Sequence, residues 1–351
     1  MTAAAKPPKH PMAPLMAIEA AESGAASARQ IDRASPLFRD LGARLRALKP
    51  KVVITCARGS SDHAAAYGKY LIETRVGVPV ASVGPSVISL YNAPLQMEGA
   101  LFVAVSQSGR SPDLLRLAEA AKAGGALVVG FVNDETSPLA ELADVFIPLC
   151  AGPEKSVAAT KSYLTACVAF LQLVAHWRED AGLMDTVAKV PGWLDAAVAL
   201  DWYPALRRLE LATGLYVLGR GVGSGAAAEI ALKCKETSRL HAEAFSAAEV
   251  VHGPFALVGP GFPILALTQD DVTAEVTRGT LAKAAGLGAP ILATETGIDG
   301  VEALPVVPGL PAEVGPLAAV ASFYMAIHKV ARARGLDPDV PPNLRKVTET
   351  V

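Results

Sequence analysis

Two groups of residues in this sequence have types and spacings suited to chemistry on a charged ligand. The first is the loop from Ser106 to Ser111, SQSGRS, which concentrates hydroxyls, an amide and one cation between an apolar run and Pro112. Hydroxyls and the backbone N–H groups at the start of a helix can donate hydrogen bonds to a phosphate. We therefore interpret this loop as a phosphate cradle. The alternative is an ordinary polar loop between a strand and a helix, because Ser and Gly are common in turns.

The second group is Glu229, Lys233 and Glu236, whose spacing places all three on one face of a helix. A carboxylate held beside an ammonium in a cleft is suited to proton transfer. The alternative is a surface ladder of salt bridges, worth roughly a few tenths of a kcal/mol per pair. The same helix is rich in Ala, Ile, Leu and Cys, which favours a position in a cleft between domains.

Two isolated residues complete the set of candidates. His252 precedes Gly253 and Pro254, so it is expected on a turn from which its imidazole can reach a ligand. Lys346 lies in a Pro-rich C-terminal tail and can contribute only if the tail folds over a site. A solvated side chain is the alternative for each of them, and the residues alone do not decide.

Alternating strands and helices must position these residues. Strands are predicted at 52–55, 79–83, 101–105, 127–132, 145–149, 215–218, 263–267 and 290–294. Helices are predicted between them at 62–74, 112–123, 161–177, 226–240, 274–285 and 316–333, after two N-terminal helices at 12–31 and 35–48. The second N-terminal helix is expected to start at Ser35-Pro36, a good cap followed by a good first residue. This rhythm predicts an α/β fold with doubly wound, flavodoxin-like parallel sheets.

The second half of the chain repeats the first at a shift of 162 residues. Ala57-Arg58-Gly59 meets Gly219-Arg220-Gly221, and Val105-Ser106-Gln107 meets Leu267-Thr268-Gln269. Two tandem copies of one domain are therefore expected. We predict an N-terminal segment at 1–33, a first domain at 34–178, a helical connector at 179–211, a second domain at 212–335 and a tail at 336–351. Asp270 and Asp271 replace cradle residues in the second copy and would repel phosphate, so phosphate binding is assigned to the first copy.

The composition excludes several classes of protein. The chain has 351 residues, is 51% hydrophobic and 19% charged, and has a formal net charge of -2, so neither nucleic acid nor an acidic membrane surface is an expected partner. Its four cysteines are scattered, which is typical of free thiols in a reducing compartment and predicts no metal site. No signal peptide or membrane span is apparent. A cytoplasmic protein is expected, with residues 1–11 disordered.

Four motifs, taken together and in order, resemble one known family. They are SQSGRSPD, SVAATKSY, KETSRLHAEAF followed by HGP, and PPNLRKVT near the end. In this combination the chain, from about Met16 onward, resembles the double sugar isomerase (SIS) domain proteins. The resemblance is to the isomerase part of glucosamine-6-phosphate synthase and, because no glutaminase sequence precedes it, to the shorter SIS-type glucosamine-6-phosphate deaminases.

The resemblance implies how the substrate is held. The phosphate would be bound by Ser60, Ser61, Ser106, Gln107, Ser108 and Ser111. The sugar would face the backbone of Val157, Ala158 and Ala159.

The resemblance also implies catalytic roles. Glu236 matches the base that moves a proton between C1 and C2, with Lys233 and Glu229 as its neighbours. His252 matches the ring-opening histidine, which reaches the site of the partner subunit and so implies a homodimer. Lys346 matches the tail lysine that forms a Schiff base with the open ketose.

The implied activity is conversion of glucosamine 6-phosphate to fructose 6-phosphate with release of ammonia. Proton transfer next to a carbonyl needs no redox cofactor and no metal, so none is expected. Three alternatives remain: another amino-sugar phosphate such as a galactosamine phosphate, ammonia-dependent synthesis, and a non-catalytic sugar-phosphate-binding regulator. The presence of Glu236, His252 and Lys346 together favours an enzyme.

Overall fold

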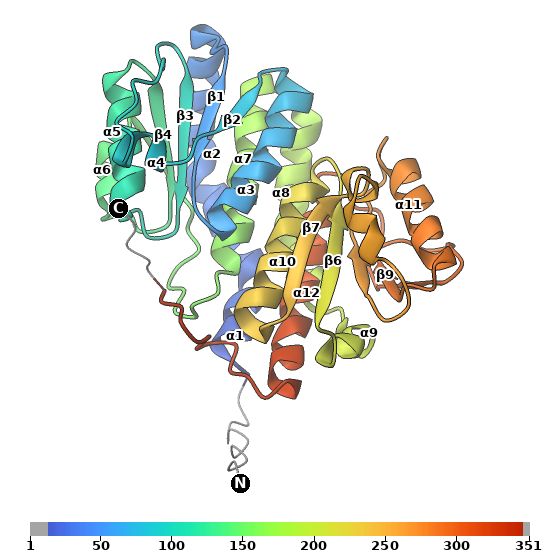
Figure 1. The fold of residues 1–351 in the computed structure, drawn as a ribbon. Coiled ribbons are helices and arrows are strands. Elements are labelled where there is room, and N and C mark those ends of the chain that lie inside the picture. The colour runs from blue at the N-terminus through green and yellow to red at the C-terminus, as the bar shows by residue number, and fades with distance from the viewer. Residues whose placement is uncertain (1–12, 347–351) are drawn as a thin grey trace.

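Two five-stranded parallel sheets form the two halves of the protein (Figure 1). The computed structural model describes residues 13–346. The first sheet has the order β2-β1-β3-β4-β5 and the second the order β10-β9-β8-β6-β7. Numbered within each half, both orders are 2-1-3-4-5, the flavodoxin-like arrangement. The predicted α/β fold with tandem doubly wound sheets is therefore confirmed, whereas the exact domain boundaries stay predictions.

The first sheet lies between two layers of helices. Its strands are β1 (Val53–Cys56), β2 (Val80–Ser82), β3 (Leu101–Ser106), β4 (Leu127–Val132) and β5 (Val145–Pro148). One face packs on α2 (Ser23–Leu48), α3 (Ser60–Leu71) and α7 (Lys161–Arg178). The other face packs on α4 (Ser86–Ser89), α5 (Pro112–Ala123) and α6 (Pro138–Leu142). Because both faces are covered, β3 and β4 are buried along their whole length and are apolar except for Ser106 at the end of β3.

The second sheet is built in the same way. Its strands are β6 (Gly214–Gly219), β7 (His241–Ser246), β8 (Ile264–Ala266), β9 (Ile291–Ala293) and β10 (Val301–Ala303). One face packs on α10 (Gly223–Ser238) and α12 (Gly315–Ala333), and the other on α11 (Ala274–Gly286). The edge strands β7 and β10 were not predicted.

A single apolar core joins the two halves through α2, α3, α7, α10 and α12. The helices α3 and α10 approach each other closely at Gly225, where a Cβ atom would lie 2.5 Å from the carbonyl oxygen of His63. The connector consists mainly of α8 (Ala181–Val198) and α9 (Tyr203–Leu206). Within residues 13–346, none of the helices has the length and apolar character needed to cross a bilayer.

The C-terminal tail runs from α12 past α1 (Leu15–Ala21) toward the first sheet (Figure 1). The carboxylate of Asp339 accepts hydrogen bonds from the backbone N–H groups of Leu15 and Met16, at 2.7 and 2.8 Å. These bonds cap the start of α1 and fix the course of the tail. The predicted disorder of residues 1–11, the predicted helix start at Met12 and the tail beyond Lys346 lie outside the described residues.

The predicted helix start at Ser35-Pro36 is wrong, because α2 continues through it. Pro36 lacks an N–H group, and a proline inside a helix costs about 3 kcal/mol. Burial of Phe38 and Leu41 in the shared core offsets this cost. The Ser35 hydroxyl does not cap a helix but donates back to the carbonyl oxygen of Ile31 at 2.6 Å.

Candidate active site

A cavity of about 350 Å³ lies at the carboxyl edge of the first sheet, where both halves and the tail meet. It is lined by Arg58, Gly59, Ser60, Ser61, Ser106, Gln107, Ser108, Ser111, Val157, Ala159, Glu236, Leu344, Arg345 and Lys346. This set contains all six residues predicted to bind phosphate, together with the predicted base and the predicted tail lysine. Residues far apart in the sequence therefore meet in one place.

The loop after β3 is shaped to present its polar groups. The Ser106 hydroxyl accepts a hydrogen bond from the N–H group of Gly109 at 2.9 Å, which closes the turn. Gly109 has a φ of +63°, and a Cβ atom there would lie 2.2 Å from the Ser137 hydroxyl oxygen. Only glycine suits this position, because it combines a left-handed backbone with no room for a side chain.

Two helices begin at the cavity. Ser60 and Ser61 form the first turn of α3, and Ser111 is the residue before α5. The Ser111 side chain makes no capping bond, so its hydroxyl is available to a ligand. The positive ends of both helix dipoles and the cations of Arg58, Arg345 and Lys346 favour an anion in the cavity.

The predicted helix face forms a chain of charges that leads from the core to the cavity. The Lys233 ammonium lies 3.2 Å from a carboxylate oxygen of Glu229 and 2.5 Å from one of Glu236. Glu229 and Lys233 are fully buried and do not line the cavity, whereas the Glu236 side chain is 20% exposed and does. The surface-ladder alternative does not describe this geometry, because the lysine is enclosed between the two carboxylates.

The buried pair stays ionised because it is richly hydrogen-bonded. Burial raises the pKa of Glu229, but Lys233, His63 and Tyr324 outweigh it and hold that pKa below its usual value. Tyr324 donates to Glu229 at 2.7 Å, and the His63 Nδ1 atom lies 3.0 Å away. Burial lowers the pKa of Lys233, but the two carboxylates outweigh it and raise that pKa.

Ser60 connects the charged helix with the cradle. Its hydroxyl donates to Glu229 at 3.1 Å and accepts from the Lys233 ammonium at 3.0 Å. With its proton committed to Glu229, Ser60 can offer a ligand its backbone N–H group rather than its hydroxyl. The position of α3, and hence of one helix start at the cavity, is thereby tied to α10.

The tail lysine is held at the cavity by a buried carboxylate. The Lys346 ammonium donates to Glu154 at 3.1 Å. Glu154 is fully buried at its side chain and also accepts hydrogen bonds from the Thr160 N–H at 2.9 Å and the Ser162 hydroxyl at 2.6 Å. Burial raises the pKa of Glu154, but Lys346 and these donors outweigh it and lower the pKa overall. The hypothesis that the tail folds over a site thus agrees with the described part of the tail.

Besides Glu229 and Lys233, two further predicted site residues do not line the cavity. His252 is exposed on the turn after residues 249–251, and it is not among the residues that line this cavity of the single chain. Ala158 is fully buried and does not line the cavity, although Val157 and Ala159 on either side of it do. The roles assigned to all the site residues stay predictions.

Sequence reasoning missed five residues that belong to this arrangement. They are Arg58, His63, Glu154, Tyr324 and Arg345. Arg58 could have been found from the sequence, because the duplication repeats it as Arg220. His63 and Tyr324 could not, since their contact with Glu229 depends on how α3, α10 and α12 pack.

Neither a metal site nor an activated cysteine is found among the described residues. Within residues 13–346 no group of three His, Cys, Asp or Glu side chains is placed to hold a metal ion. The four cysteines are free. Burial raises the pKa of Cys56 and of Cys234 to about 12, so neither is a thiolate at neutral pH.

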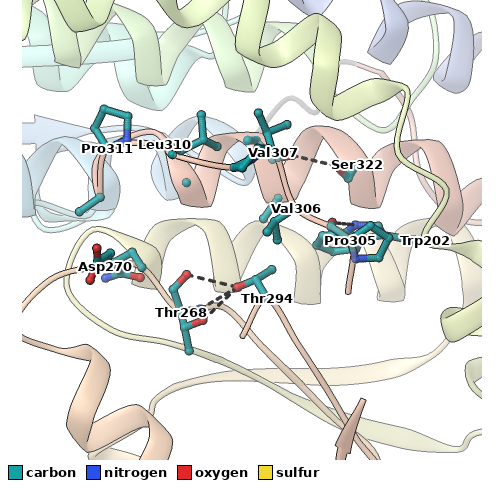
Figure 2. Close-up of a pocket in the computed structure, with 17 residues that line it drawn as sticks. Trp202, Thr268, Asp270, Thr294, Pro305, Val306, Val307, Leu310, Pro311 and Ser322 are labelled. Atoms are coloured by element: carbon teal, nitrogen blue, oxygen red, sulfur yellow. Dashed lines mark hydrogen bonds between the residues drawn. The ribbon is translucent and has the colours of Figure 1, made fainter. Parts of the chain in front are cut away.

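A smaller cavity of about 170 Å³ lies at the carboxyl edge of the second sheet (Figure 2). Thr268 and Asp270 line it, the counterparts of Ser106 and Ser108 in the first half. Its polar groups bind one another: the Thr268 N–H donates to the Thr294 hydroxyl at 2.8 Å, and the Trp202 indole donates to the Pro305 carbonyl at 2.7 Å. None of the predicted site residues lies here.

Comparisons with known proteins agree with this architecture. The SIS domain profile matches residues 48–176 and 209–295, which contain most of the two sheets. The glutamine–fructose-6-phosphate aminotransferase (isomerizing) of Symbiobacterium thermophilum is 34% identical over 324 residues, which are 87% of this chain and 52% of that protein. The chain thus spans about half the length of the curated relatives it matches.

Solved structures give the same result. The crystal structure of a proposed phosphosugar isomerase from Silicibacter pomeroyi DSS-3 is 41% identical, with a TM-score of 0.89, and covers 93% of this chain and 100% of its own. The C-terminal domain of glucosamine-fructose-6-phosphate aminotransferase from Francisella tularensis is 25% identical, with a TM-score of 0.82, and covers 94% of this chain and 99% of its own. The resemblance inferred from the four motifs is confirmed, and the chain belongs to the SIS domain family.

Proposed function

We propose that this protein is a phosphosugar isomerase that acts on an amino-sugar phosphate, converting glucosamine 6-phosphate and water to fructose 6-phosphate and ammonia. One observation carries the proposal. A single cavity is lined both by a cradle for phosphate and by a partly exposed carboxylate, Glu236, and an amine, Lys346. The names of the relatives support the same substrate class.

The cradle holds the phosphate and so fixes the position of the sugar chain. Ser106, Ser108 and Ser111 and the starts of α3 and α5 supply donors, and Arg58 and Arg345 supply positive charge. Holding the substrate in one orientation makes proton transfer within the complex effectively unimolecular.

Glu236 moves the proton that interconverts the aldose and the ketose. It removes the hydrogen from C2 of the open-chain aldehyde, whose carbonyl makes that hydrogen acidic, and returns a proton to C1. The product is a C2 imine, which water hydrolyses to the ketose and ammonia. Atoms and electrons balance within the sugar, because C1 is reduced as C2 is oxidised. Lys233 orients Glu236, since its ammonium is held in turn by the buried Glu229.

Lys346 adds covalent catalysis from the tail. Its neutral amine attacks the C2 carbonyl of the ketose, and loss of water from the adduct leaves a carbon–nitrogen double bond. The resulting Schiff base corresponds to the adduct that the family resemblance implies. The Glu154 side chain has no exposed surface, so it acts by holding the lysine at the cavity, 3.1 Å away, rather than by touching the sugar.

Ring opening requires a further acid or base, which we assign to His252 of the partner subunit in a homodimer. The assignment is supported by the exposure of His252 on its turn and by its absence from the residues that line the cavity of its own chain. The four free cysteines are consistent with a reducing compartment, and we propose the cytoplasm.

A substrate panel tests the proposal. Glucosamine, galactosamine and mannosamine 6-phosphates are each incubated with the enzyme, and ammonia and ketose phosphate are measured separately. Equal amounts of ammonia and fructose 6-phosphate from glucosamine 6-phosphate are expected. If a ketose forms from another epimer alone, that epimer is the substrate. If glucosamine 6-phosphate forms from fructose 6-phosphate and ammonia in the reverse assay, the enzyme works in the synthetic direction. Binding without conversion of any sugar phosphate would refute the proposal in favour of a regulator.

A further inference from the structure

A third cavity, of about 410 Å³, is lined by second-half counterparts of part of the candidate active site, whereas the counterparts of Ser106 and Ser108 line the cavity of Figure 2. The shift of 162 residues relates Arg58 to Arg220 and Ser111 to Thr273, and both counterparts line this cavity. The active site takes Glu236 from the second half, and this cavity takes Thr74 from the first half. The same shift of 162 residues relates Thr74 to Glu236, so Thr74 has the position of the base. We call this cavity the second-copy cavity. It keeps an arginine and hydroxyls but has no carboxylate in the place of the base.

Arg220 is an unsatisfied cation in the second-copy cavity. In the first half, Arg58 forms an ion pair with Asp113 at 2.7 Å. Within the described residues, the Arg220 guanidinium has no such partner, and one of its terminal nitrogens is both inaccessible to solvent and without a hydrogen bond. A buried donor without an acceptor is unfavourable, so a shift of the Arg220 side chain that brings this nitrogen to an anion in the cavity would be favoured.

Carboxylates face the same cavity, which gives it charges of both signs. Glu313 lines it and pairs with Arg75, and Asp271 lines it with its Oδ1 atom accepting from the Thr273 N–H at 2.7 Å. The remaining capacity of these carboxylates suits an ammonium or a hydroxyl group. The volume is suitable for a small ligand of the size of a hexose phosphate.

We propose that the second-copy cavity binds a small zwitterion of the amino-sugar phosphate class, with its anionic group on Arg220 and its amine toward Asp271 and Glu313. This revises the expectation that two aspartates exclude phosphate from the second copy. Asp270 lines the neighbouring cavity of Figure 2 instead, and Asp271 is turned toward Thr273. Because Thr74 cannot act as a carboxylate base, the site binds its ligand without converting it.

The second-copy cavity and the active site are joined by the same two helices. At its start, α3 supplies Ser60 to the active site, and near its end the chain supplies Tyr70 and Thr74 to the second-copy cavity. In the opposite direction, α10 follows Val222 at the second-copy cavity and carries Glu236 at the active site. A ligand in the second-copy cavity therefore contacts the elements that position both the cradle and the base.

Calorimetric titration of a variant with a strongly weakened and inactive active site, used at ligand concentrations too low to fill that weakened site, tests the proposal. In Ser106→Ala/Ser108→Ala/Glu236→Gln protein, glucosamine 6-phosphate is expected to bind with one site per chain. Fructose 6-phosphate, which lacks the amine, and glucosamine, which lacks the phosphate, should each bind at least about 10-fold more weakly, the equivalent of about 1.4 kcal/mol. No binding by this variant, or equal binding of all three probes, would overturn the proposal.

Two substitutions then locate the site. Adding Arg220→Met should abolish the remaining binding. Adding Thr74→Glu, at an exposed position on the cavity wall, should weaken it at least about 10-fold by placing a carboxylate near the anion, while the neutral Thr74→Gln of the same size should leave it within about 3-fold. Unchanged binding in both Arg220→Met and Thr74→Glu would place the ligand elsewhere. Turnover is not measured, so the outcome does not depend on the proposed function.

Discussion

Replacing Lys233 by methionine tests whether the charged helix face is held together as the structure shows. The substitution keeps an unbranched side chain of similar length and removes the ammonium. Glu229 then remains fully buried with hydrogen bonds from Ser60, His63 and Tyr324 but no ammonium beside it. Removing one partner of a buried ion pair costs about 3–5 kcal/mol, because the other charge is left uncompensated. We expect the free energy of unfolding of Lys233→Met to fall by this amount.

Urea unfolding, followed by far-ultraviolet circular dichroism and by tryptophan fluorescence, measures the loss. The double variant Glu229→Gln/Lys233→Met should recover more than half of it, since a neutral amide can keep the Tyr324 bond without an unpaired charge. Lys329→Met is the matched control. Lys329 is 40% exposed and pairs with Asp201 at the surface, so its loss should cost less than about 1 kcal/mol. A loss in Lys233→Met as small as in the control, or a double variant no more stable than the single, would refute the argument.

The other predictions concern the cradle, the tail and the pH dependence of stability. Ser106→Ala/Ser108→Ala should raise KM by about 10²-fold or more, since a hydrogen bond to a charged group contributes roughly 1.5–3 kcal/mol. Asp270→Ala in the second half should leave KM nearly unchanged, and a wild-type KM in the double variant would contradict the assignment of the cradle. Borohydride added with fructose 6-phosphate should attach a hexitol phosphate to Lys346, and Lys346→Arg should abolish the adduct because a guanidinium stays protonated; mass spectrometry that finds the adduct on another lysine would contradict the assignment. Burial lowers the pKa of His328 from 6.5 to about 4, so between these pH values this side chain binds a proton in the unfolded chain but not in the folded protein. The free energy of unfolding should therefore fall by roughly 3 kcal/mol as the pH drops from 6.5 to 4. That loss should be largely absent in His328→Gln, and equal slopes for the two proteins would contradict the burial argument.

Local patterns were enough to predict most of the fold. The apolar runs of β3 and β4, the proline at the start of α5 and the matching segments around Arg58 and Arg220 each lie within a few residues, and the structure has the predicted elements there. The edge strand β7 was missed because its sequence, HAEAFS, alternates exposed and buried residues without a strong apolar run. The helix break at Pro36 was wrong because burial of Phe38 and Leu41 in the shared core, which the local pattern does not show, decides the course of α2.

The candidate site was predictable only where its residues share a segment. The cradle loop and the Glu229–Glu236 face are each local, so their spacing was visible. The partners of Glu229, namely His63 and Tyr324, come from other helices, and their contacts exist only after α3, α10 and α12 have packed. The same holds for Glu154 and Lys346, which are separated by most of the chain and meet because Asp339 directs the tail past α1.

The most direct test of the account is whether Glu236 moves the proton between C1 and C2. The reaction is run in deuterium oxide with glucosamine 6-phosphate, and deuterium at the sugar carbons is measured by NMR for the wild type and for Glu236→Gln. Removal of a general base lowers the rate by about 10²–10⁴-fold. We predict an exchange rate reduced by this factor in Glu236→Gln, with substrate binding retained. Exchange at the wild-type rate in the variant would contradict the account, because Glu236 would then be only a structural partner of Lys233.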